Sequence, residues 1–76
     1  MTGAQAAEAE TFALTVNGQM MQTVPTTLAD LVARLGHDPA SIATAVNGDF
    51  VARKARAERR LVAGDQVEIV APRQGG

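Results

Sequence analysis

Two Asn-Gly pairs, Asn17-Gly18 and Asn47-Gly48, constrain the fold of this chain more than any other feature. Asn and Gly tolerate the positive φ angles of a tight type I′ turn, and such a turn joins the two strands of a β-hairpin. Before the first pair, Phe12, Leu14 and Val16 alternate with Ala and Thr, and a period of two is typical of a strand with one buried face. The sequence therefore predicts two hairpins, one around each pair.

The strands expected from these turns are short, as in most small sheets. They cover residues 12–16, 19–24, 42–46, 49–51 and 66–70. Pro25 ends the second of them, because proline has no N–H to donate to a ladder. In the last strand Val67 and Ile69 fall on one face, with Glu68 on the other.

One amphipathic helix is expected between the hairpins. Its apolar stripe consists of Leu28, Leu31, Val32 and Leu35, at the spacing i, i+3, i+4 and i+7. Thr27 and Asp30 have the spacing of a capping box, and Gly36 suits a left-handed C-cap. A mixed sheet of four or five strands packed on this helix would bury the stripe, so the sequence predicts an α+β roll.

The size and composition exclude several classes of function. A chain of 76 residues forms one domain with little room for an enclosed catalytic pocket, so we expect that it is not an enzyme. It contains no Cys, and His37 is its only His, so we expect no metal site. With a net charge of −1 and 3% aromatic residues, nucleic-acid binding is not expected either. No apolar run approaches the ~20 residues that span a bilayer, so we expect a cytoplasmic protein without membrane contact.

Five of the seven Lys and Arg residues lie in one segment, 53–60. They are Arg53, Lys54, Arg56, Arg59 and Arg60. We expect this segment to cross the surface as a solvated connection. Its alternative role is electrostatic docking to an acidic partner, where it would tune the association rate.

The two ends of the chain lack large apolar side chains. We therefore expect a flexible extension over 1–11, a domain over 12–70 and a flexible tail over 71–76. The tail ends in Gly75-Gly76, which presents a terminal carboxylate on an arm without β-carbons at its last two positions. Such an arm can thread a narrow channel in another protein. Because an ionised carboxylate is a poor electrophile, acyl chemistry at Gly76 requires activation by a partner that uses ATP.

Four segments in this order are similar to those of a known family. They are Thr27-Leu28-Ala29-Asp30-Leu31-Val32, Ala45-Val46-Asn47-Gly48, Gly64-Asp65-Gln66-Val67-Glu68-Ile69-Val70 and Gly75-Gly76. Together they resemble the ubiquitin-like sulfur carriers of the ThiS/MoaD family, and most closely the carriers of thiamine biosynthesis. The resemblance implies a ubiquitin-like β-grasp fold and a protein substrate rather than an enzyme.

The resemblance also implies partners and site residues. An E1-like adenylyltransferase would join Gly76 to AMP, a sulfur donor protein would supply the sulfur of a thiocarboxylate, and a thiazole synthase would accept that sulfur. The carrier itself would bind no cofactor, because the partner uses the ATP. Gln74 and Gly75 would thread the channel. We expect the docking face to contain exposed apolar side chains of the sheet, with Val70 and either Met20 or Met21 among them.

Three alternatives stay open from the sequence. Within the family, the alternative is the small subunit of molybdopterin synthase. Outside it, a non-catalytic ubiquitin-fold interaction module would use only the sheet face. A protein modifier would instead form isopeptide bonds with lysines of its partners.

Overall fold

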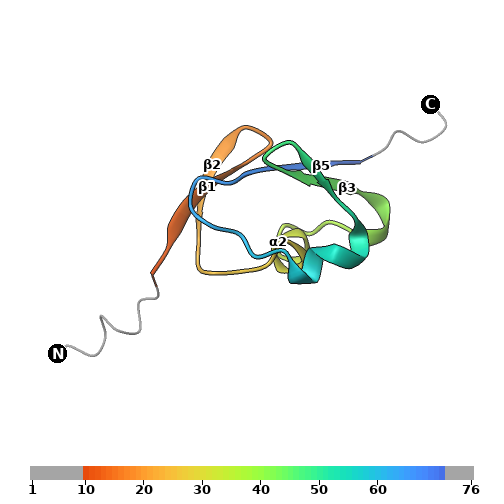
Figure 1. Ribbon diagram of the computed structural model, residues 1–76, viewed down its shortest axis with the longest axis horizontal. Coiled ribbons are helices and arrows are strands. Elements are labelled where there is room, and N and C mark those ends of the chain that lie inside the picture. Colours follow the sequence, from red (N-terminus) through yellow and green to blue (C-terminus); the bar gives the residue numbers. More distant parts are fainter. Residues whose placement is uncertain (1–9, 72–76) are drawn as a thin grey trace.

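The five strands lie close to the predicted positions. The computed structural model describes residues 10–71. Its strands are β1 (Phe12–Val16), β2 (Gln19–Thr23), β3 (Ala43–Val46), β4 (Asp49–Val51) and β5 (Gln66–Val70). Among these residues they form one mixed sheet in the order β2-β1-β5-β3-β4, in which β1 and β5 are parallel and the other pairs antiparallel. The last strand of the sequence is thus the central strand of the sheet (Figure 1).

Both Asn-Gly pairs form the expected turns. Asn17 and Gly18 have φ angles of 52° and 85°, and Asn47 and Gly48 have 54° and 86°. Two consecutive positive φ angles are the mark of a type I′ turn. Two strand ends differ from the prediction by one residue: β2 stops at Thr23, just before the chain leaves the sheet at Pro25, and β3 begins at Ala43.

The expected helix is α2 (Leu28–Arg34), and its N-terminus is capped as predicted. The Oγ1 of Thr27 accepts a hydrogen bond from the backbone N–H of Asp30 at 3.2 Å. The prediction for Leu35 is wrong: its side chain is 40% exposed. The helix ends at Arg34 and Leu35 is its C-cap, so Leu35 lies past the last turn that faces the sheet.

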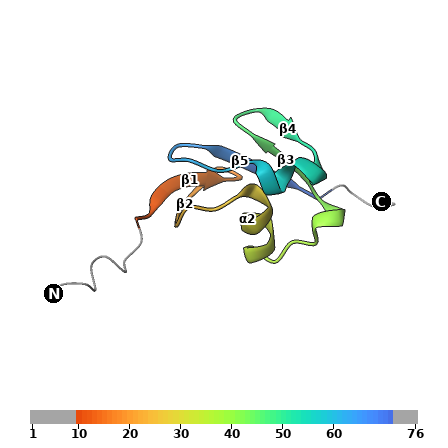
Figure 2. The same ribbon diagram turned by 60° about the horizontal axis from the view of Figure 1, so that its bottom comes forward.

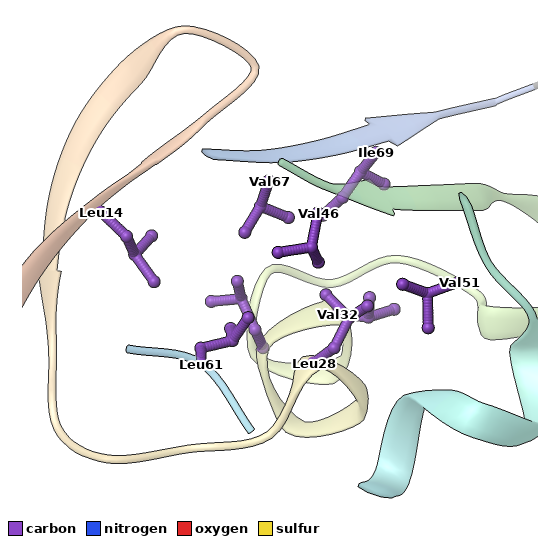
Figure 3. Packing of buried hydrophobic residues seen from close by; sticks show 9 residues of the cluster. Leu14, Leu28, Val32, Val46, Val51, Leu61, Val67 and Ile69 are labelled. Carbon is purple, nitrogen blue, oxygen red and sulfur yellow. The ribbon is translucent and has the colours of Figure 1, made fainter. Parts of the chain in front are cut away.

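The core lies between α2 and one face of the sheet (Figures 1 and 3). Leu28 and Val32 of the helix point toward Val46 and Val67 of the sheet (Figure 3). The full buried cluster is Leu14, Leu28, Leu31, Val32, Val46, Val51, Leu61, Val67 and Ile69. Each strand that contributes to it does so with alternate residues, which leaves the opposite face of the sheet uncovered by helix (Figure 2).

Two 3-10 helices complete the helical layer: η1 (Pro39–Ser41) and η2 (Arg53–Glu58). η1 ends at Ser41 and Ile42 is its C-cap, which explains why β3 starts one residue later than predicted. η2 contacts α2 and replaces the irregular connection expected over 53–60 (Figure 2). This segment therefore packs on α2 through a minority of its residues, while most of its side chains are exposed, as expected for a surface connection.

Candidate functional site

The terminal residues Gln74, Gly75 and Gly76 lie outside the described residues, as does most of the extension expected over 1–11 and of the tail expected over 71–76. The structure does describe the strand that leads to this terminus. β5 is paired with β1 on one edge and with β3 on the other, and it ends at Val70. Six residues follow Val70 in the sequence. The segment that leads to Gly76 therefore follows the central strand of the sheet, which is hydrogen-bonded on both edges.

The face of the sheet opposite α2, here called the outer face, is set by the alternation of the strands. In β5 the buried Val67 and Ile69 point to the helix, so Glu68 and Val70 point to the outer face. The pairing of Ala43 with Val70, and of Ala45 with both Glu68 and Phe50, places these partners on the same face.

An apolar patch covers one end of the outer face. It consists of Ala43, Ala45, Phe50 and Val70, and is called the Phe50–Val70 patch below. Phe50 is 72% exposed and Val70 57% exposed. The small side chains of the two alanines lie between them and leave both large side chains accessible. An exposed aromatic residue next to an exposed valine is typical of a surface that binds another protein.

Sequence reasoning did not identify Phe50 as a site residue. The signal was present, because Phe50 lies between Asp49 and Val51 in a three-residue strand. Val51 faces the core, so Phe50 must face outward. What the sequence did not show is that β3 pairs with β5, which brings Phe50 of the β3–β4 hairpin onto the same face as Val70.

The two methionines predicted as possible docking residues lie on opposite faces of the sheet. Met20 is 74% exposed and pairs with Thr15, which in turn pairs with Gln66, so it lies on the outer face. Met21 is half-buried and packs against the core. Together with Ala13, Thr15 and Gln66, Met20 lines a shallow hollow of about 170 Å³. Gln66 precedes Val70 by four residues, so this hollow lies about 13 Å along β5 from the patch.

Arg56 is not part of a solvated basic surface, which corrects the expectation for 53–60. Its side chain is 3% exposed. The guanidinium donates from Nε to the Thr44 hydroxyl at 3.0 Å, from Nη1 to the Pro39 carbonyl at 2.9 Å and from Nη2 to the Ile42 carbonyl at 2.8 Å. Burial lowers the pKa of Arg56 below its ordinary value, and the nearby charge of Arg53 adds to this effect. Arg56 therefore joins η2 to β3 and η1.

The exposed basic residues Arg53, Lys54 and Arg60 lie at or beside η2, in the helical layer and not on the outer face. A partner seated on the Phe50–Val70 patch would leave them uncovered. The basic segment and the apolar patch are thus two separate surfaces.

Residues 10–71 hold no cluster of candidate metal ligands and no candidate membrane-spanning helix. They contain no group of three or more His, Cys, Asp or Glu residues that could hold a metal ion. None of their helices is long and apolar enough to cross a membrane. The N–H of Ala40 and the hydroxyl of Ser41 donate to Asp38 and lower the pKa of its carboxyl, but this residue caps η1.

The fold defines a class: a β-grasp protein of the ubiquitin-like kind, with a mixed sheet on one main helix. An apolar patch lies on the outer face of this sheet at the end of β5. The sequence matches the ThiS family over residues 8–76, so the chain belongs to this family. Membership supports a role as a small sulfur carrier protein of thiamine biosynthesis rather than as a catalyst.

Solved structures agree with this assignment. The chain is similar to the crystal structure of thiamine biosynthesis protein ThiS from Geobacter metallireducens, with 27% identity and a TM-score of 0.73 over 86% of this chain and 100% of that one. It is also similar to the NMR structure of a thiamine biosynthesis protein from the same organism, with 26% identity and a TM-score of 0.70 over 86% of this chain and 88% of that one. No curated protein matches the sequence significantly. The predicted β-grasp fold and the family resemblance are confirmed.

Proposed function

We propose that this chain carries sulfur as a thiocarboxylate on Gly76 for the synthesis of the thiazole ring of thiamine. A carboxylate oxygen of Gly76 attacks the α-phosphate of ATP in an E1-like adenylyltransferase, and pyrophosphate leaves. A sulfur nucleophile at the oxidation level of sulfide, supplied by a donor protein, then attacks the acyl carbon, and AMP leaves. A thiazole synthase accepts the sulfur from the resulting thiocarboxylate. The chain itself supplies the carboxylate and a docking surface.

The observation that supports this proposal most is the position of the Phe50–Val70 patch. Val70 belongs to the patch and is also the last residue of β5. The six residues from Ala71 to Gly76 span at most about 20 Å when extended. An enzyme that docks on the patch therefore has the terminal carboxylate within that distance of its contact surface. The exposed Phe50 is the expected centre of the contact, because buried aromatic side chains dominate most protein interfaces.

The narrow arm belongs to the same proposal. Gly75 and Gln74 precede the reacting residue, and a channel that excludes water around ATP favours an arm without β-carbons near its end. Exchange of pyrophosphate into ATP should fall from the wild type to Gly75→Ala and further to Gly75→Val. The melting temperature of the free protein should stay unchanged. Equal exchange for all three proteins would rule out a narrow channel.

The deciding experiment is the intact mass of the protein isolated from its own cells. We expect a species whose mass corresponds to the replacement of one oxygen by sulfur. A variant that lacks Gly76 should fold, as judged by circular dichroism, and should lack this species. Its loss of folding, or a retained sulfur species, would contradict the proposal.

The alternatives give different results in the same samples. Discrete bands of higher mass on a gel, dependent on Gly76, would indicate a protein modifier, and an unchanged mass without such bands would indicate an interaction module. Transfer of sulfur to a molybdopterin precursor, and not to thiazole synthase, would indicate the molybdopterin branch.

A further inference from the structure

The side chain of the turn residue Asn17 has no role in the docking patch or in the proposed transfer of sulfur. The residue has a φ of 52° and is the first residue of the turn between β1 and β2. Its Nδ2 donates to the carbonyl of Ile69 at 3.1 Å, and its Oδ1 accepts from the N–H of Ile69 at 2.9 Å. Both polar atoms of the amide are therefore used by a single residue of β5.

These two bonds continue the parallel ladder between β1 and β5. The N–H of Thr15 donates to the carbonyl of Asp65 at 3.0 Å, and the N–H of Asn17 donates to the carbonyl of Val67 at 2.8 Å. The ladder advances by two residues on each strand, so its next step falls at Ile69. The backbone of the first hairpin turns away at Asn17, but a side-chain amide carries the same donor and acceptor as a peptide group. The Asn17 amide thus takes the place of the missing residue of β1.

Ile69 lies near the exit of the C-terminal arm. It is buried, and it precedes Val70, the last residue of β5. Val70 is held on the other edge, by its pairing with Ala43 of β3. Among residues 10–71, the pair at Ile69 is therefore the last one that the first hairpin makes with β5 before the chain continues to Gly76.

We infer that Asn17 is a positioning residue for the sulfur-carrying arm: its amide fixes Ile69, and so the point and direction in which the chain leaves the sheet toward the adenylating enzyme. This inference rests on the proposed function. Without the amide, the N–H and carbonyl of Ile69 lose their partners on this edge, and the end of β5 gains freedom to separate from the sheet. Fewer of the docked molecules would then hold the terminal carboxylate at ATP.

Asn47 provides a matched control. It occupies the same position in the second type I′ turn, with a φ of 54°. Its Nδ2 donates to Oδ1 of Asp65 at 2.9 Å, and its Oδ1 accepts from the N–H of Gln66 at 2.9 Å. The side-chain amide of Asn47 thus also makes two hydrogen bonds, but these lie at the start of β5 rather than at its end.

The experiment compares Asn17→Gly with Asn47→Gly. Gly keeps the positive φ of each turn and removes both hydrogen bonds of the side-chain amide. Hydrogen exchange followed by NMR reports the protection of the Ile69 amide. Pyrophosphate exchange with the adenylating enzyme gives kcat and KM for each carrier. For Asn17→Gly we expect roughly tenfold lower protection of Ile69. We also expect a kcat about three- to tenfold lower with nearly unchanged KM, since the docking patch is intact. Asn47→Gly should keep the wild-type kcat.

Two outcomes separate this inference from the proposed function. If the wild type supports exchange and both glycine variants share its kcat, the role of Asn17 is wrong and the carrier function stands. If the wild type supports no exchange, the proposed function fails and the inference fails with it. Should Asn17→Gly not fold, Asn17→Asp replaces it, because its carboxylate still accepts from Ile69 N–H but opposes the Ile69 carbonyl. A wild-type kcat for Asn17→Asp would then overturn the inference.

Discussion

At the scale of single residues, Arg56 shows how one charged side chain can belong to the core. A guanidinium has five N–H donors in a fixed plane, and three of its hydrogen bonds here go to neutral oxygens of three different residues. The Thr44 hydroxyl that accepts from Arg56 donates in turn to the carbonyl of Val51 at 2.8 Å. Removal of the guanidinium would thus take a donor from the buried Thr44 hydroxyl and from the part-buried carbonyls of Pro39 and Ile42.

We expect Arg56→Met to lower the free energy of unfolding by about 3 kcal/mol, because it removes three charge-assisted hydrogen bonds and leaves one buried hydroxyl and two part-buried carbonyls without this donor. Urea denaturation followed by circular dichroism measures the change. Arg53→Met is the control: Arg53 is exposed in the same 3-10 helix, so its replacement should change stability by less than about 0.5 kcal/mol. Equal effects of the two substitutions would show that the buried network does not stabilise the fold.

A second residue-scale prediction concerns Asp38. Its carboxylate accepts from the Ala40 N–H and from the Ser41 hydroxyl, each at 3.0 Å, and these bonds lower its pKa below the ordinary value of 3.8. A carboxyl with a lowered pKa stabilises the fold above its unfolded-state pKa, and this contribution is lost as the pH falls through the folded-state pKa. Ser41→Ala should therefore raise the pKa of Asp38 toward 3.8, measured by NMR titration of the carboxyl carbon. No change in the pKa would contradict the role of the Ser41 hydroxyl.

At the scale of elements, α2 depends on its caps and its packing. Its seven residues are too few to form a stable helix alone. Three apolar side chains attach it to the sheet, and Thr27 satisfies one of its free N–H groups. The helix is thus short because Leu35 and Gly36 end it, and it is stable because the sheet covers its apolar face.

Thr27→Ala should cost about 1 kcal/mol of stability, because it removes the oxygen that accepts from the Asp30 N–H. Thermal or urea unfolding measures the loss. Thr27→Ser keeps the oxygen and should recover most of the wild-type stability. If the serine variant is as unstable as the alanine variant, the methyl group of Thr27 and not its hydroxyl is responsible.

At the scale of the whole molecule, the sheet separates two surfaces. The outer face carries the Phe50–Val70 patch beside the exit of the C-terminal arm. The helical layer lies on the other side of the sheet (Figure 1), and it carries the exposed basic residues of η2. The patch can therefore engage an enzyme without help from the basic segment. Any contribution of that segment to binding would come through long-range attraction, which salt screens.

We expect Phe50→Thr to weaken binding to the adenylating enzyme about tenfold or more, because it removes the exposed aromatic side chain of the patch. The melting temperature should change little, since Phe50 is 72% exposed and Thr is also favourable in strands. Isothermal titration calorimetry measures the affinity. Val62→Thr is the control, because Val62 is 58% exposed but precedes β5 in a loop outside the patch. Equal losses for both variants would show that the patch is not the docking site.

The sequence by itself determined the local structure. The type I′ turns depend on the φ preferences of Asn and Gly, and the strands and helix follow from the spacing of apolar residues around them. The capping residue Thr27 likewise predicts where α2 begins. These features depend on neighbours within a few positions of one another, so the order of residues alone contains the needed information. The family resemblance adds the roles expected for Gly76 and its arm.

Only the tertiary structure decided which of these elements meet. The pairing of β3 with β5 places Phe50 and Val70 on the same face, the packing of η2 buries Arg56, and the parallel pairing of β1 with β5 brings Asn17 to Ile69. Each of these arrangements depends on residues that are distant along the chain. Local preferences do not determine which strand or helix pairs with which. That choice depends on how five strands and one helix together bury their apolar faces and pair their peptide groups.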